Sequence, residues 1–203
     1  MNDMSIDFVS LDIEDADKVG TICSIALVRV REGCIVGQAD WLIDPEHGFS
    51  PRAIKEHGIT SDQVKGKPTF GQKWDDIRLF IGNDILIAFH AVDDMLRLIY
   101  DLQAYKMTYQ CRFACAERLS QEILGYDRMK GAKNDLAAYC QKCGIKHSRK
   151  KPHKAIKDAH ACALLTIKLC EIKQANSICE LCDGIVDIQL LNELMREKHI
   201  ERL

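Results

Sequence analysis

Residues 5–14 read SIDFVSLDIE, and this stretch decides the fold class. It alternates at first and then becomes mostly apolar, which predicts a β-strand buried on both faces. Two segments rich in β-branched residues follow at 22–30 and 34–43, and Glu32-Gly33 between them is typical of a hairpin turn. The chain therefore begins with three predicted strands.

Strands and helices alternate after this start. Short strands are predicted at 85–91 (ILIAFHA) and 107–111 (MTYQC). Apolar residues that recur on one face predict helices at 69–82, 93–105, 112–124, 132–143 and 155–172. This order predicts an α/β fold with a mixed sheet flanked by helices.

The pattern changes from about residue 171, and we expect a main domain at 1–173 and a C-terminal helical extension at 174–203. Residues 185–203 predict an amphipathic helix that Asp187 caps, and its apolar side carries Ile188, Leu191, Leu194 and Met195. Two roles stay open for this helix, which are packing back onto the domain and binding a partner.

The composition is that of a soluble globular protein, with 203 residues, 47% hydrophobic and 29% charged. Lys and Arg total 28 against 30 Asp and Glu, which excludes binding of polyanions by bulk charge but allows a local basic patch. The longest apolar run near the middle, at 85–89, is too short to span a membrane. With no secretory signal in the first residues, we expect a cytoplasmic protein.

Ten cysteines include two Cys-x-x-Cys pairs, Cys140/Cys143 and Cys179/Cys182. The gap of 35 residues between the pairs exceeds the roughly 15–20 residues usual in a zinc ribbon. The first pair also falls in a predicted helix. We expect cysteines that pack in a reduced interior, and a zinc site is the alternative.

Acidic residues follow the predicted strands. Asp12 and Glu14 lie two apart at the end of the first strand, so both side chains point to one face. Asp94 follows the strand at 85–91, and Asp158 lies in the first turns of the helix at 155–172, five residues after His153. If these carboxylates are buried together, they need a neutralising charge. If the strand instead ends at the solvent-exposed surface, water solvates them and no such charge is needed.

Three ordered motifs resemble those of the DEDDh family of 3′–5′ exonucleases, typified by the proofreading subunit of bacterial DNA polymerase III. Asp-x-Glu-Thr matches at Asp12 and Glu14, and His-Asn-Ala-x-Phe-Asp matches at Ala91 and Asp94. The stretch EHGITSDQVKGKPTF at 56–70 also resembles a loop of the family. His-x-Ala-x-x-Asp-Ala matches at His153, Ala155, Asp158 and Ala159.

The resemblance implies a ribonuclease-H-like fold, with a mixed five-stranded sheet flanked by helices. It implies that two Mg²⁺ or Mn²⁺ ions bind to four carboxylates, Asp12, Glu14, Asp94 and Asp158. His153 would accept the proton of the attacking water, and nucleoside 5′-monophosphates would leave from the 3′ end of a nucleic acid, DNA being favoured. A DNA polymerase or another replication protein is a candidate partner.

The motifs depart from the family at several positions. Asp15 replaces Thr and Asp17 replaces Gly, and the added negative charge is expected to alter substrate fit. Phe89 and His90 replace His-Asn. Asp93 replaces Phe, which leaves Asp93 as an alternative ligand to Asp94, although motif spacing favours Asp94 with Asp93 as a helix cap.

A basic run at 146–154 adjoins His153. Arg149, Lys150 and Lys151 are predicted to contact phosphates of a single strand, and a solvated loop is the alternative. Phe89 and Phe113 are the candidate aromatics for stacking a base. Beside the exonuclease stand two further interpretations, which are a catalytically weakened module that binds single strands or a replication partner, and a zinc-stabilised interaction protein.

Overall fold

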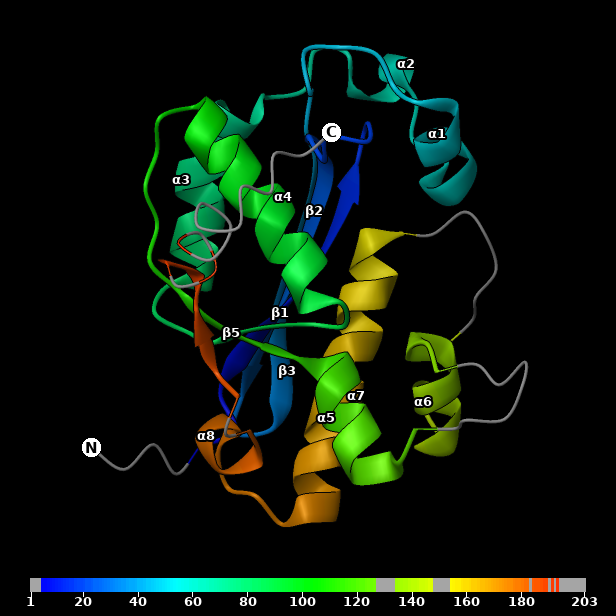
Figure 1. Cartoon of the computed structure of the whole chain (residues 1–203), viewed down its shortest axis with the longest axis vertical. Coiled ribbons are helices and arrows are strands. Elements are labelled where there is room, and N and C mark those ends of the chain that lie inside the picture. Colours follow the sequence, from blue (N-terminus) through cyan, green and yellow to red (C-terminus); the bar gives the residue numbers. More distant parts are fainter. Residues whose placement is uncertain are drawn as a thin grey trace.

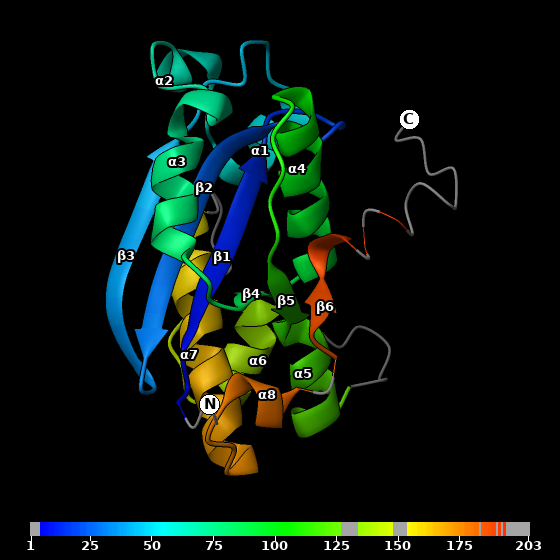
Figure 2. The same cartoon turned by 90° about the vertical axis from the view of Figure 1, so that its left-hand side faces the viewer.

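The computed structural model describes residues 5–126, 134–147, 154–182, 184–189, 191 and 193. Figure 1 shows the whole chain, in which helices surround a central sheet. Strands from the described residues form one mixed sheet in the order β3-β2-β1-β4-β5-β6, which Figure 2 shows from left to right. β1 pairs antiparallel with β2 and parallel with β4 and is therefore an inner strand. The bounds of the strands are β1 Phe8–Asp15, β2 Ile22–Arg31, β3 Cys34–Leu42, β4 Leu86–Ala88, β5 Arg112–Cys115 and β6 Val186–Asp187.

Helices cover both faces of the sheet (Figure 2). Alternate residues of β1 join different cores: Phe8 packs with the helices of one face, and Val9, Leu11 and Ile13 pack with those of the other. This division confirms a first strand buried on both sides. The helices of the first face are α5 Ala116–Leu124, α6 Leu136–Lys142, α7 Ala155–Lys173 and α8 Ile178–Leu181, and those of the second are α3 Phe70–Ile81 and α4 Ala91–Ala104.

Of two short helices, α1 (Pro51–His57) lies beside the carboxyl end of β1, and α2 (Ser61–Val64) lies above α3 at the same end of the molecule (Figure 2). At the far end of the sheet, the hairpin predicted between β2 and β3 is confirmed. Glu32 and Gly33 both have positive φ, 49° and 72°, as the favoured two-residue hairpin turn requires. The mixed α/β architecture is therefore the predicted one.

The strand predicted at 107–111 was placed too early, and the following helix was started too early. β5 spans Arg112–Cys115 and α5 begins at Ala116, because Phe113 pairs with Leu86 of β4 and is buried there. Long-range pairing decides which residues of an extended segment join the sheet, and the local pattern does not contain it.

The C-terminal segment adds a sixth strand to the five that were expected. Val186–Asp187 pairs antiparallel with β5, and Ile188 next to it is buried. Asp187 accepts a hydrogen bond from the backbone N–H of Gln189 (2.7 Å). Most of the helix predicted at 185–203 lies outside the described residues, and the boundary at residue 173 stays a prediction. No helix in the described part of the chain is long and apolar enough to cross a membrane.

Candidate active site

The end of β1 carries two acidic residues on one face. Asp12 and Glu14 pair in register with Ala26 and Ser24 of β2, and the ladder shifts its register immediately after Glu14. Since neighbouring residues of a strand point to opposite faces, the two carboxylates lie on the same side of the sheet. The third, Asp158, comes from the first turn of α7, which packs on that face.

Asp12, Glu14 and Asp158 come together. Each offers one carboxylate oxygen, and these three oxygens all lie within 4.8 Å of one another. They line a cavity of about 290 Å³, which we call the acidic cavity; its other wall residues include Glu56, Asp94, Arg97 and His147. Residues distant in sequence thus converge as the motifs predict.

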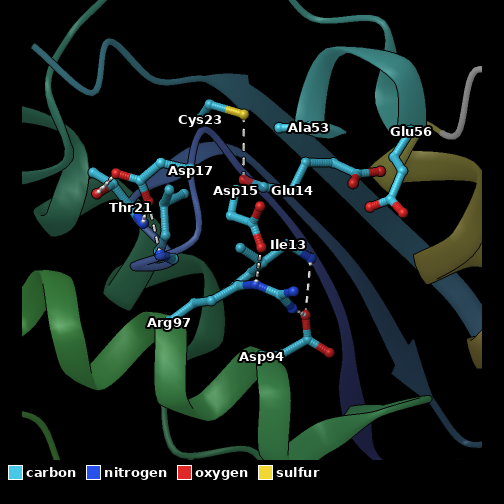
Figure 3. Close-up of polar contacts among 12 residues, drawn as sticks. Ile13, Glu14, Asp15, Asp17, Thr21, Cys23, Ala53, Glu56, Asp94 and Arg97 are labelled. Atoms are coloured by element: carbon cyan, nitrogen blue, oxygen red, sulfur yellow. Dashed lines mark hydrogen bonds and ion pairs between the residues drawn. The ribbon is translucent and has the colours of Figure 1, made fainter. Parts of the chain in front are cut away.

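Asp94 lies in the first turn of α4 and is only 4% exposed. Its Oδ1 accepts a hydrogen bond from the backbone N–H of Ile13 (3.2 Å), between the two acidic residues of β1 (Figure 3). Asp93, the alternative ligand, also lines the acidic cavity but is exposed. The N-cap position of α4 is His90, whose side chain makes no capping hydrogen bond, so Asp93 is not the cap. The buried position favours Asp94 as the fourth member of the site.

Burial and mutual repulsion disfavour the charged forms of these carboxylates. The pKa of Asp12 lies well above its usual value because of burial and the nearby charges of Asp94, Glu14 and Asp158. Burial raises the pKa of Asp94 to about 7, although Arg97 and the Ile13 N–H oppose the rise. A divalent cation would offset this charge, and an all-oxygen donor set fits Mg²⁺ or Mn²⁺.

Asp15, which departs from the motif, is paired with a cation. The Arg97 Nε donates to Asp15 Oδ2 at 2.8 Å, and Figure 3 shows the guanidinium between Asp15 and Asp94. Asp17 accepts hydrogen bonds from the backbone N–H groups of Gly20 (2.8 Å) and Thr21 (3.3 Å). The extra charges expected to alter substrate fit are therefore engaged within the protein.

One imidazole in the cavity was not expected. His147 Nε2 lies 3.0 Å from Asp158 Oδ1, and its side chain is only 10% exposed. His147 lies outside the motifs, and its one sequence signal is its place in the basic run. His153 and the basic residues Arg149, Lys150 and Lys151 lie outside the described part of the chain, so their predicted roles stay predictions.

Phe89 forms a wall of the cavity and not an open stacking surface. It is 6% exposed, and its ring lies 4.9 Å from the ring of His90 and 6.3 Å from that of Tyr139. Phe113, the other candidate, belongs to strand β5 and is buried in the core at 3% exposure. Their burial leaves little of either ring for a base, which corrects the expectation of stacking.

The loop after α1 is tied to the end of β1 by one histidine. His57 is buried, its Nε2 lies 3.0 Å from the Asp15 carbonyl oxygen, and its Nδ1 accepts from the backbone N–H of Ile59 (3.0 Å). These partners fix the tautomer with the proton on Nε2. The His-Gly-Ile-Thr stretch thus holds α1, with Glu56, against the acidic cavity.

The paired cysteines do not gather. Across residues 5–126, 134–147 and 154–182 and the short described pieces beyond, the one group of three or more potential ligands is Asp12, Glu14 and Asp158. Cys140 is buried against the Ala161 carbonyl, and Cys179 is exposed. This arrangement favours packing residues over the zinc-stabilised protein.

The fold is shared with solved nucleases. The structure titled Exonuclease X in complex with 5′ overhanging duplex DNA matches with a TM-score of 0.63 and 23% identity, covering 82% of this chain and 93% of that one. The predicted ribonuclease-H-like α/β fold is thereby confirmed.

Two curated relatives are bacterial replication proteins. DNA polymerase III subunit epsilon of Rickettsia conorii is 29% identical over 127 residues, which are 63% of this chain and 55% of the relative. DNA polymerase III PolC-type of Bacillus subtilis is 31% identical over 150 residues, which are 73% of this chain and 10% of the relative. The chain thus spans about half or less of the length of these relatives.

The family model described as Exonuclease (RNase_T) matches residues 7–166, which contain all three motifs and every member of the acidic cavity. The chain therefore belongs to the exonuclease family, as its motifs predict.

Proposed function

We propose that this chain is a metal-dependent 3′–5′ exonuclease that releases nucleoside 5′-monophosphates from the 3′ ends of nucleic acid. The observation that supports this best is the convergence of Asp12, Glu14 and Asp158, with three carboxylate oxygens within 4.8 Å, in a chain of the exonuclease family. Burying so much negative charge at the end of a strand is costly unless a cation neutralises it.

The four carboxylates Asp12, Glu14, Asp94 and Asp158 would hold two Mg²⁺ or Mn²⁺ ions. When bound, such ions would lower the pKa of water, so that hydroxide is available near neutral pH. They would also stabilise the negative charge on the phosphate and on the departing 3′-oxygen. Raised pKa values at Asp12 and Asp94 are what an acidic cluster shows without its counter-ions. The protein supplies a prearranged set of oxygen donors.

An imidazole is proposed to take the proton of the attacking water. The family resemblance gives this role to His153. Two described imidazoles line the cavity, His90 and His147. His147 lies 3.0 Å from Asp158, and we propose that it orients that carboxylate.

A single strand is the favoured substrate form, because a cavity of about 290 Å³ is of a size to hold little more than one nucleotide. DNA is favoured over RNA, since the replication relatives are DNA polymerase III proteins. The same names make a DNA polymerase the candidate partner. Arg149, Lys150 and Lys151 are proposed to contact the phosphates of the strand.

Digestion of matched DNA and RNA oligonucleotides with labelled 3′ ends tests the proposal. With Mn²⁺ or Mg²⁺ we expect mononucleotides from the wild type and none from Asp12→Asn. Asp75→Asn removes the same charge from an exposed position on α3 and serves as the control. Binding of single strands without cleavage would refute the enzyme and favour the weakened binding module.

The proton acceptor is tested by pH–rate profiles of His153→Ala and His147→Ala. We expect the wild-type rate to fall towards acid pH as the acceptor is protonated, and this fall to be lost in His153→Ala. A profile that His153→Ala leaves unchanged would contradict its role.

A further inference from the structure

The side of the acidic cavity next to α4 contains a fixed cation. Arg97 follows Asp94 by three residues, so the two side chains share one face of α4. Its Nε donates to Asp15 Oδ2 at 2.8 Å, whereas its Nη1 lies 3.6 Å from Asp94 Oδ1. Arg97 therefore contacts Asp15 more closely than it contacts Asp94, as Figure 3 shows.

The hydrogen bond and the ion pair that Asp94 makes with described residues both use one oxygen, which leaves the other for a ligand. Both the Ile13 N–H and Arg97 Nη1 approach Oδ1. The terminal torsion of an aspartate is broad, so a carboxylate is oriented by what its oxygens bind. With Oδ1 held, Oδ2 is the oxygen that remains for a divalent cation in the acidic cavity.

A guanidinium that was free to move would compete for that second oxygen. Arginine forms paired parallel hydrogen bonds with both oxygens of a carboxylate, and the burial of Asp94 (4% exposed) strengthens such a pair. Asp15 opposes this pairing because it already binds the Nε of Arg97. One of the common paired arrangements between an arginine and a carboxylate uses this Nε. The structure thus contains two acids that share one arginine.

We propose that Asp15 is a positioning residue, which holds Arg97 away from full engagement with Asp94 and so keeps Asp94 available to a divalent cation. This inference rests on the proposed function and deepens it. It also accounts for two features together, the Asp that replaces Thr after the first motif and the Arg one turn after Asp94. The pair sets the affinity of the acidic cavity for its metal.

Calorimetric titration of Mn²⁺ into the full chain, without nucleic acid, tests the proposal. Asp15→Asn keeps the shape and removes the charge that holds Arg97. We expect its Mn²⁺ affinity to fall about tenfold or more, the usual effect of losing a group that orients a metal ligand. The double variant Asp15→Asn/Arg97→Met removes the competitor and is expected to regain an affinity within about threefold of the wild type.

Controls separate this from a loss of folding or of function. Asp75→Asn is expected to bind Mn²⁺ as the wild type does, and urea unfolding checks that each variant is folded. Unchanged affinity in Asp15→Asn would overturn the proposal, and so would a double variant as weak as the single one. A wild type that binds Mn²⁺ but cleaves no nucleic acid would refute the proposed function. The comparison of Mn²⁺ affinities among the variants would still test the role of Asp15.

Discussion

Replacing Asp101 with Asn tests how α4 holds the strands beside the site. Asp101 is 2% exposed, and its Oδ2 accepts a hydrogen bond from the backbone N–H of Ile22, the first residue of β2 (3.0 Å). Burial raises its pKa from 3.8 to about 6, although the Ile22 bond opposes the rise. Asn keeps an oxygen acceptor for Ile22 and carries no charge.

The size and sign of the effect follow from that pKa. A difference of about 2 in pKa corresponds to about 3 kcal/mol between the two protonation states. Because the folded-state pKa is the higher one, the wild type loses stability as the pH rises from about 4 to about 6, and the loss is complete above the folded pKa. Asp101→Asn has no group that ionises here, so it does not lose this stability.

The assay is urea unfolding of both proteins, in EDTA, at several pH values between 4 and 8. We expect nearly equal free energies of unfolding at the acid end, and an advantage for Asp101→Asn that grows to at most about 3 kcal/mol at neutral pH. Asp101→Ala, which removes the acceptor as well, is expected to lose about 1–3 kcal/mol against Asn throughout. A difference between wild type and Asn that does not vary with pH would refute the reasoning.

Mg²⁺ or Mn²⁺ at about one hundred times its dissociation constant should add about 2.7 kcal/mol to the free energy of unfolding, measured with and without EDTA. A gain that persists in Asp12→Asn would place the ion elsewhere. His57→Ala should cost about 2–4 kcal/mol in urea unfolding, because the Ile59 N–H and a β1 carbonyl lose their partner, and a neutral result would rule out this tether. Gly71→Ala should destabilise α3 by about 1–3 kcal/mol, since the new Cβ would lie 2.5 Å from Tyr105 Cδ1. Thermal unfolding checks this, and a higher melting temperature would contradict it.

The strongest periodic segments predicted their elements well. The strand that ends at the first motif, the hairpin at Glu32 and the helices of residues 70–81 and 155–173 lie where their patterns place them. In each of these elements the hydrophobic pattern follows directly from which faces are buried. An inner strand, for example, has apolar residues on both faces. These same elements carry Asp12, Glu14 and Asp158, so the motifs converge once the elements form.

Partners that are distant in sequence could not be predicted in this way. Arg97 and Asp15 are 82 residues apart, and nothing near either residue signals the ion pair. The one available signal is on α4, where Asp94, Arg97 and Asp101 recur at helical spacing beside the apolar residues. His147 gave a weaker signal still, because a histidine in a basic run has no periodicity.

The position of β1 has a consequence for how the site can be opened. Its first half pairs with β2 on one edge and with β4 on the other, whereas Asp12, Ile13 and Glu14 pair with β2 alone. Because cores cover both faces, the backbone amides of that first half are expected to exchange with solvent deuterium only when the whole domain unfolds. The N–H that Ile13 donates to Asp94 belongs to this strand. Two of the carboxylates thus directly continue the strand segment that is expected to exchange most slowly, so we expect their positions to form when the domain folds, with or without a cation.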